Sequence, residues 1–408
     1  MILGELLVES GWHERLWCPV QCEVELPEGV ALGELRLRDK TTGGPVPLQA
    51  WPSEKGQVGL AWVVDKMEWQ SQRSYELVSS DEAQAPTGQG VVLSQETPGD
   101  LRVYIGGEYF TCYHFGAEVV RPYLYPILAS GGVAVTRNWP MVPDMPGETH
   151  DHPHHKGLWT AHGDVNGVDN WSETPGHGYV IHRRFARLYN GPVVGRFTQE
   201  LDWTDAERNR VLTETRRVLF YNSPPEVRLF DWQVTLHASE GEVVLADTKE
   251  AGLISVRVAT PMDARNEGRI ENGYGARQET ETWGKRAPWC DYSGPVEGAW
   301  RGMCVMDHLD NPRHPTHWHV RDYGLMTANC FGLHDFTADP ANRWDLAIAA
   351  GQSCTWRYRV LVHEGDAGEG RAAVHYHDYV HPPRVRVLPP YARATNLGEI
   401  WVAEKLSV

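Results

Sequence analysis

The segment Val227-Arg-Leu-Phe-Asp-Trp-Gln-Val-Thr-Leu236 decides the fold class, because apolar and polar side chains alternate along it. The even-numbered residues from Phe230 to Leu236 are apolar and share one face of an extended chain, and the odd-numbered ones are polar. Val227 and Leu229 interrupt the polar face at its start, so we expect that end to be buried on both sides. The segment therefore predicts a long strand that covers a core.

Short strand-like segments recur through the rest of the chain, whereas Glu369–Val380 is the best candidate for a helix. The clearest strand-like segments are Leu101–Ile105, Arg121–Tyr125, Arg217–Tyr221, Val243–Ala246, Leu253–Val258 and Trp356–Val362. The 40 glycines and 27 prolines fit an all-β protein whose strands are joined by long loops. The sequence predicts an all-β fold built on a large two-sheet sandwich.

The first 80 residues have the pattern of a smaller unit. From Leu6 to Ser79, short alternating segments such as Gly59–Val64 are separated by turns, of which Asp39–Pro45 is one. We predict a small β-sandwich over residues 1–80, a boundary or long loop in the polar segment Ser80–Gly90, and a large β-domain over residues 81–408 that carries the site.

Composition narrows the possible partners. The formal charge of −16 disfavours nucleic acid and anionic membranes, because both need a basic face. We expect no membrane span, since no window approaches the roughly 18 apolar residues required, and the N-terminus has no signal-peptide pattern. The seven cysteines show no zinc-knuckle spacing, so we expect reduced thiols in a cytoplasmic protein. The 17 tryptophans and 16 tyrosines suit a carbohydrate partner, because aromatic faces stack on sugar rings.

Histidine is concentrated in two windows. Seven of the 19 histidines lie between His150 and His182, and five more lie between His308 and His334. Histidine titrates near neutral pH and is a common metal ligand. We therefore predict that the two windows form one polar site.

The first window contains the run His150-Asp-His-Pro-His-His-Lys-Gly-Leu-Trp159. Because Pro153 disfavours a helical conformation of the residue before it, we expect an extended loop with alternating side chains. His150, His152 and His154 would then share one side, and Asp151 and His155 the other. His152, His154 and His155 are candidate catalytic residues.

Charged residues follow the apolar strand Val243–Ala246 abruptly, in the run Asp247-Thr-Lys-Glu250. Glu250 is a candidate general acid or base and Lys249 a candidate partner, although the two could instead form a salt bridge at the rim. Arg257 could bind an anionic or enediolate-like oxygen, or could be an exposed strand arginine.

The second window, His314-Pro-Thr-His-Trp-His-Val-Arg321, places His317, His319 and Arg321 on one face of an extended chain. His319 is a further candidate catalytic residue and Arg321 a candidate substrate ligand. The H-x-H spacing permits one divalent cation, Zn²⁺, Mn²⁺ or Ca²⁺, with a third ligand from His150–His155 or Glu250. Whether a metal is bound stays open.

Aromatic and amide side chains beside these motifs resemble a sugar subsite, in which a stacking platform lies next to hydroxyl partners. These tryptophans could equally belong to the core. The candidate substrate-binding residues are Trp159, Trp171, Arg137, Asn138, Asn170 and Asn329, together with Arg257 and Arg321.

Several motifs together resemble one bacterial family. They are Arg121-Pro-Tyr-Leu-Tyr-Pro, Thr136-Arg-Asn-Trp-Pro, Asp151–Trp159, Asp247-Thr-Lys-Glu-Ala-Gly, Tyr292-Ser-Gly, Asn311-Pro-Arg-His-Pro-Thr and Trp318-His-Val-Arg-Asp-Tyr-Gly. They resemble the family labelled methane oxygenase PmoA-like, which is otherwise of unknown function, over roughly Leu101 to His363. The resemblance implies a supersandwich of the galactose-mutarotase type and, by analogy of fold alone, carbohydrate chemistry. We reject methane oxidation, because a true particulate methane oxygenase subunit is a membrane protein.

Three hypotheses follow. The leading one is a carbohydrate-active enzyme that cleaves or isomerises a glycoside, or an oxidised keto or uronate sugar, by His and Glu acid–base chemistry. Histidines outnumber paired carboxylates here, which favours proton abstraction next to a carbonyl over hydrolysis, which usually needs two carboxylates. The second is a carbohydrate-binding protein without turnover, and the third is a metal-dependent oxygenase with two histidines and a carboxylate on a redox metal.

Overall fold

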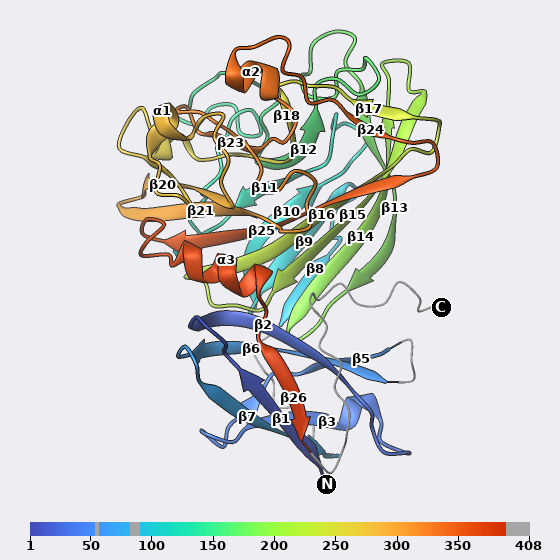
Figure 1. Cartoon of the computed structure of the whole chain (residues 1–408), viewed down its shortest axis with the longest axis vertical. Helices are drawn as coiled ribbons and strands as arrows, with labels where there is room; N and C mark the ends of the chain where they lie inside the picture. The colour runs from blue at the N-terminus through green and yellow to red at the C-terminus, as the bar shows by residue number, and fades with distance from the viewer. Residues whose placement is uncertain (54–56, 82–89, 389–408) are drawn as a thin grey trace.

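Two eight-stranded antiparallel sheets, packed face to face, form the upper part of the molecule in Figure 1. The structure is a computed structural model that describes residues 1–53, 57–81 and 90–388. We call the two sheets S1 and S2. The order in S1 is β22 (Trp318–Val320), β23 (Leu325–Ala328), β18 (Ala251–Arg257), β12 (Leu158–His162), β11 (Tyr123–Ile127), β10 (Glu108–His114), β9 (Asp100–Ile105) and β8 (Val91–Ser94).

The second sheet contains the strand from which the fold class was predicted. The order in S2 is β13 (Tyr179–Tyr189), β14 (Val194–Thr204), β15 (Arg210–Tyr221), β16 (Val227–His237), β25 (Ser353–Glu364), β21 (Ala299–Asp307), β20 (Trp289–Val296) and β19 (Arg269–Asn272). A two-stranded sheet of β17 (Val243–Leu245) and β24 (Leu346–Ile348) lies beside them. The predicted all-β sandwich is confirmed.

The inner faces of S1 and S2 make one core. The predicted apolar face of β16, from Phe230 to Leu236, is buried in it against residues such as Leu101 of S1. Trp232 also donates a hydrogen bond from Nε1 to Oγ1 of Thr160, 3.0 Å away, which ties the sheets together. Full burial of a side chain the size of Phe230 contributes about 1.5–3 kcal/mol.

The start of β16 is buried on both sides, as its sequence predicts. Leu229 packs outside S2 in a separate cluster with residues of helix α3 (Ala372–Val380), and Val227 packs against that cluster. The predicted helix is therefore confirmed, beginning three residues later than expected. There are two shorter helices: α1 (Gln278–Thr282) contacts the edge strand β22, and α2 (Leu333–Thr337) follows β23 along the chain.

The N-terminal unit is a sandwich of a five-stranded and a three-stranded sheet. The first has the order β26 (Arg384–Leu388), β1 (Ile2–Glu9), β7 (Gln72–Ser79), β3 (Leu35–Asp39) and β4 (Pro45–Val46), and the second β2 (Arg15–Val24), β6 (Val58–Met67) and β5 (Gln49–Pro52). Strand β26, drawn in red in Figure 1, joins this unit although it comes from the far end of the chain. The predicted division at residue 80 therefore assigns β26 to the large domain, although this strand belongs to the N-terminal sheet.

Asp378 of α3 connects the two units, because its carboxylate binds Arg15 at 3.1 Å and His13 at 3.0 Å. The predicted boundary segment Ser80–Gly90 lies mostly outside the described residues. All seven cysteines are free thiols. In the part of the chain that the structure describes, no helix has the length and apolar character needed to cross a bilayer.

Candidate functional site

The predicted site residues gather on the outer face of S1. Alternation along the strands explains why: Leu158 and Val256 point into the core, so their neighbours Trp159 and Arg257 point outward. His319 likewise lies between two core residues of β22. The outer face is lined by its own aromatic cluster, which includes Tyr123, Tyr125, Trp159, Trp171 and Tyr323.

The histidine run is a tight turn, and the prediction of an extended loop is wrong. His152 has a positive φ of 44°, and the backbone N–H of His155 donates to its carbonyl oxygen at 3.0 Å. The turn brings His154 beside His155, with ring centroids 4.5 Å apart, and beside His152 at 5.8 Å. The three predicted catalytic histidines therefore form one cluster, while His150 stacks separately on Trp139.

Four rings form a continuous stack that leads from the surface into the molecule. Tyr323 stacks on His152 at 5.0 Å, His152 on His155 at 4.7 Å, and His155 on Trp159 at 5.2 Å. The His152 side chain is 40% exposed, whereas His155 and Trp159 are buried. His152 therefore covers His155.

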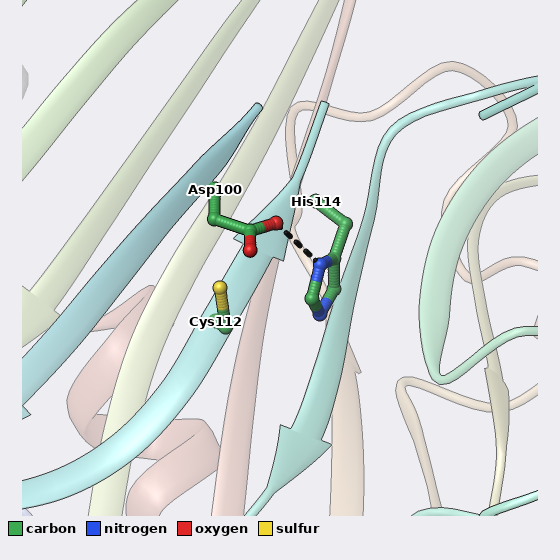
Figure 2. A group of neighbouring side chains, drawn as sticks. All are labelled: Asp100, Cys112 and His114. Carbon is green, nitrogen blue, oxygen red and sulfur yellow. Dashed lines mark hydrogen bonds and ion pairs between the residues drawn. The ribbon is translucent and has the colours of Figure 1, made fainter. Parts of the chain in front are cut away.

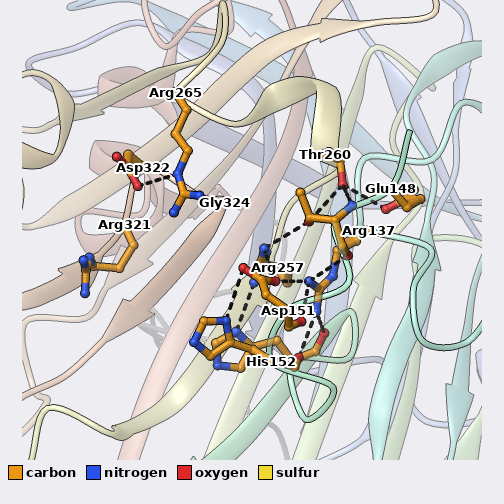
Figure 3. A network of polar contacts seen from close by, with 12 residues as sticks. Arg137, Glu148, Asp151, His152, Arg257, Thr260, Arg265, Arg321, Asp322 and Gly324 are labelled. Atoms are coloured by element: carbon orange, nitrogen blue, oxygen red, sulfur yellow. Dashed lines mark hydrogen bonds and ion pairs between the residues drawn. The ribbon is translucent and has the colours of Figure 1, made fainter. Parts of the chain in front are cut away.

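Two buried arginines hold the histidine turn in place. Asp151 lies between them, and its Oδ1 binds Arg137 at 2.5 Å and Arg257 at 2.7 Å (Figure 3). Arg137 also donates to the backbone oxygens of Asp151, His152 and His155. Burial raises the pKa of Asp151, but the hydrogen bond from His152 and the two arginines outweigh it and hold that pKa well below its usual range.

Arg257 also fixes the tautomer of His155. Its Nη1 lies 3.3 Å from Nδ1 of His155, and a guanidinium can only donate, so Nδ1 accepts and Nε2 carries the proton. Burial, followed by the charges of His154 and Arg257, lowers the pKa of His155 well below its usual value. The Nε2–H has no hydrogen-bond partner among the described residues. His155 is thus a neutral ring with one uncommitted donor.

His319 repeats this arrangement on β22. Nε1 of Trp283 donates to Nδ1 of His319 at 2.9 Å, and because an indole only donates, the proton of His319 lies on Nε2. Burial and the charges of Arg321, Lys249 and His152 lower the pKa of His319 to about 3.

Glu250 lies in the same electrostatic environment as His319. Burial raises its pKa, and Lys249, His152 and Arg321, the three residues that act on His319, partly oppose that rise. Nζ of Lys249 is 3.9 Å from Oε1 of Glu250, and both side chains are about two-fifths exposed. Asn329 joins the second window to the Asp247–Glu250 run, because it donates to the carbonyls of His317 and Lys249 at 2.9 Å. His152 of the first window stacks on Tyr323, two residues after Arg321, so the structure brings all three segments together.

Several predicted substrate ligands have partners inside the protein instead. Asn329 is buried, donates to the carbonyls of Thr248 and Lys249 and accepts from two backbone N–H groups, so it supports the Lys249 segment. Asn138 accepts a hydrogen bond from the hydroxyl of Tyr125 and donates one to the carboxylate of Glu148.

Arg321 has an internal partner as well, and the tryptophans predicted to stack on a sugar are buried. Arg321 pairs with Glu279 at 2.9 Å. Trp159, Trp171 and Asn170 are at most 2% exposed, so the two tryptophans offer no open stacking surface. The amide atoms of Asn170 and the Nε1 of both tryptophans have no hydrogen-bond partner among the described residues.

Two residues beside the histidine turn, Tyr323 and Asp263, were not predicted from the sequence. Tyr323 stacks on His152 and has the guanidinium carbons of Arg257, Arg265 and Arg321 within 5.3 Å of its ring centre. It lies in the turn between β22 and β23, and its position two residues after Arg321 of the second histidine window was a usable signal. Asp263 carried none in the sequence.

Asp263 is a buried carboxylate whose Oδ1 has no hydrogen-bond partner among the described residues. Burial raises its pKa to about 6, against the opposing charges of Arg257 and Arg265. A carboxyl group that titrates near neutral pH is a second candidate acid beside the histidine turn.

The histidine windows do not contain the group best arranged for a metal. In the described ranges, the three-residue group whose ligand atoms lie within 4.8 Å of one another is Asp100, Cys112 and His114 (Figure 2). A depression of about 390 Å³ lies on S2, with Arg183, Asp202 and His237 in its lining, and contains none of the predicted site residues.

Residues 100–377 match a family described as a family of unknown function, DUF6807, and the chain belongs to that family. No curated protein matches the chain. Among solved structures, the chain is similar to a protein in the glycosyl hydrolase family 38 from Enterococcus faecalis, with 9% identity and a TM-score of 0.44. That match covers 95% of this chain and 47% of the other, so this chain spans about half the length of its neighbour. We draw no argument about activity from it.

Proposed function

We propose that this member of the DUF6807 family is an enzyme that acts on a carbohydrate by proton transfer to or from carbon next to a carbonyl. The observation that carries the proposal is the fixed tautomer of His319, whose Nε2 carries the proton, while Lys249, His152 and Arg321 act on both His319 and Glu250. A neutral imidazole whose N–H faces a reacting oxygen stabilises the negative charge that develops there. The predicted resemblance to the PmoA-like family stays a prediction, as does the oxygenase hypothesis.

The proposal assigns different roles to residues that the sequence grouped together. His319 donates through Nε2–H and holds the enolate oxygen, and His155 adds a second N–H once His152, which covers it, moves aside. Glu250 moves the proton, because its raised pKa brings it nearer to neutral pH. Arg257 and Arg137 are positioning residues, since their contacts fix the turn and the tautomer of His155.

Proton abstraction fits this chemistry better than hydrolysis. Glycoside hydrolysis usually needs one carboxylate on each side of the scissile bond. Three of the charged groups that act on Glu250 are cations or an imidazole, and the one carboxylate among them, Asp335, is engaged by the backbone N–H of Lys249 at 3.0 Å. A sugar C–H becomes acidic enough only next to a carbonyl. Suitable substrates are therefore keto-glycosides and uronates. The enzyme would either eliminate a group from them or isomerise them.

The test is turnover on a panel of glycosides and their 3-keto and uronate forms. Glu250→Gln is expected to lower kcat about 10²- to 10⁴-fold, and His319→Asn, which keeps an acceptor for Trp283, about 10²- to 10³-fold. Glu200→Gln is the matched control, because Glu200 is 41% exposed and paired with Arg184 on S2.

The panel also distinguishes the enzyme from a binding protein. Saturable sugar binding without turnover in the wild type, unchanged in Glu250→Gln and His154→Ala, would move the protein to the binding class. Turnover with equal loss in Glu200→Gln and Glu250→Gln would also contradict the assigned roles.

A further inference from the structure

The β9–β10 hairpin places three different metal-ligating side chains on the outer face of S1, away from the histidine turn. Asp100 lies opposite His114 in the register of the two strands, and Cys112 is two residues before His114 on the same face. The ligand atoms, a carboxylate oxygen, a thiol sulfur and an imidazole nitrogen, all lie within 4.8 Å of one another (Figure 2).

A close approach of the backbone produces this arrangement. The N–H of Phe115 donates to the carbonyl of Gly99 at 2.7 Å. A Cβ atom on Gly99, which has a φ of +84°, would lie 2.7 Å from Cα of Gly116. Glycine at positions 99 and 116 therefore allows the ends of β9 and β10 to approach closely, which places Asp100 beside His114.

The orientation of His114 is the strongest sign of a cation. Its Nε2 lies 2.8 Å from the carbonyl oxygen of Tyr125, and because a carbonyl only accepts, Nε2 carries a proton. Its Nδ1 lies 2.7 Å from Oδ1 of Asp100. Two lone pairs cannot face each other at that distance, so either a second proton or a metal ion lies between them.

The same orientation is typical of metal-bound histidines. A ligating imidazole commonly donates its other N–H to a backbone carbonyl, which fixes the ring and its tautomer. The ring of His114 also packs at 4.9 Å from that of Tyr123, which limits its rotation. His114 is thus held with Nδ1 directed at the place where Asp100 and Cys112 converge.

We infer that Asp100, Cys112 and His114 bind one zinc ion. Thiolate and imidazole ligands select zinc over calcium or magnesium, which prefer oxygen alone. Two ligands of one zinc ion lie about 3–4 Å apart, given bonds of about 2.0–2.3 Å. Small side-chain movements from the observed positions satisfy this geometry.

Three protein ligands leave a fourth coordination position for water or a ligand oxygen, which is typical of a catalytic rather than a structural zinc site. The side chains of Asp100 and His114 are 29% and 24% exposed, so that position faces solvent, while Cys112 is buried. The ligand class that this position would take is a small oxygen donor such as a hydroxyl or carboxylate.

The inference is tested by metal binding to the full chain, first stripped with a chelator and then titrated with Zn²⁺ or Co²⁺. We expect one equivalent of Zn²⁺, a thiolate-to-cobalt charge-transfer band in the near ultraviolet, and a higher Tm with Zn²⁺, because the ion binds only the folded state. Loss of a second-shell partner alone weakens metal binding about 10- to 100-fold, so Asp100→Asn and His114→Gln should lose at least that much.

Three variants make the test specific. Cys112→Ser should abolish the cobalt–thiolate band, whereas Cys354→Ser, which removes a half-buried free thiol, should leave it intact. His154→Ala should leave zinc affinity unchanged. Wild-type affinity in folded Asp100→Asn or His114→Gln, no binding by the wild type, or loss of binding in His154→Ala would each overturn the inference.

Discussion

Two histidines with the same exposure, 1%, have opposite electrostatic surroundings. His155 lies in the turn on the outer face of S1, with Nδ1 accepting from Arg257, and its pKa is lowered. His363 lies on β25 of S2, with Nε2 2.7 Å from Oδ2 of Asp291. Burial lowers the pKa of His363, but the Asp291 carboxylate outweighs it and raises that pKa.

The difference shows that a neighbouring carboxylate can reverse the direction in which burial shifts the pKa of a histidine. Burial alone would make both rings neutral. A carboxylate partner turns His363 into half of an ion pair that serves the fold. Burial keeps His155 and His319 neutral, and their arginine and indole partners leave Nε2 of each ring as the N–H donor that the proposed chemistry needs.

The largest effect should come from breaking the pair in S2. Asp291→Asn removes the charge that faces His363, and loss of one partner of a buried pair costs about 3–5 kcal/mol. Urea unfolding followed by circular dichroism measures this loss. The double variant Asp291→Asn, His363→Gln should recover part of it, and an unchanged single variant would show that His363 is neutral.

The pH dependence of stability should have opposite signs at the two kinds of histidine. The folded-state pKa of His319, about 3, lies below the unfolded value of about 6.5. Its contribution is therefore present above pH 6.5 and lost as pH falls, by roughly 2 kcal/mol per histidine between pH 6.5 and 5. His319→Asn should flatten this acid slope in unfolding titrations.

His363 gives the opposite control. Its folded-state pKa is raised, so its contribution is complete below the unfolded pKa and is lost as pH rises through the folded one. His363→Gln should therefore remove stability mainly at low pH. The same slope in both variants would contradict the comparison.

A smaller effect is expected from Asp151→Asn, because the Asp151 side chain is 35% exposed. The change leaves Arg137 and Arg257 buried without their shared anion, and solvent reduces the cost to about 1–3 kcal/mol. The proposed activity should fall more than stability, since the turn that presents His155 loosens. Thermal unfolding together with kcat on the substrate panel measures both, and unchanged kcat would exclude a positioning role for the turn.

The smallest change in stability is expected for an exposed ion pair. Arg184 and Glu200 form an ion pair on S2 with side chains 66% and 41% exposed. Arg184→Ala should change the free energy of unfolding by less than about 1 kcal/mol, because water screens exposed pairs. A larger loss of stability would mean that the charge of a partner matters as much at the surface as it does for the buried histidines.

The sequence predicted the fold well because alternation is a local property. The face from Phe230 to Leu236 and the double burial near Leu229 follow directly from side-chain order. The histidine turn could not be predicted in this way, because the positive φ of His152 occurs in a turn that Arg137 and Arg257 hold through hydrogen bonds to His152 and Asp151.

Only part of the site could be predicted, because the sequence shows which residue types cluster but not which neighbours each side chain will have. The joining of the two windows with Glu250 follows from clustered residue types, whereas the roles of single residues depend on their neighbours. Asn329 and Trp159 are as polar or as aromatic as the sequence argument required, but the fold uses them as supports. The hairpin Asp100–His114 pairs residues whose separation in sequence gave no familiar spacing.

The pairing of β26 with β1 has a consequence for the order of events during synthesis. Residues 2–9 are synthesised long before their edge partner, residues 384–388. Until then β1 is an open edge strand, free to pair with another chain. The N-terminal sandwich is thus closed only after the large sandwich has been translated, and nascent chains stopped before residue 384 would be prone to aggregate through β1.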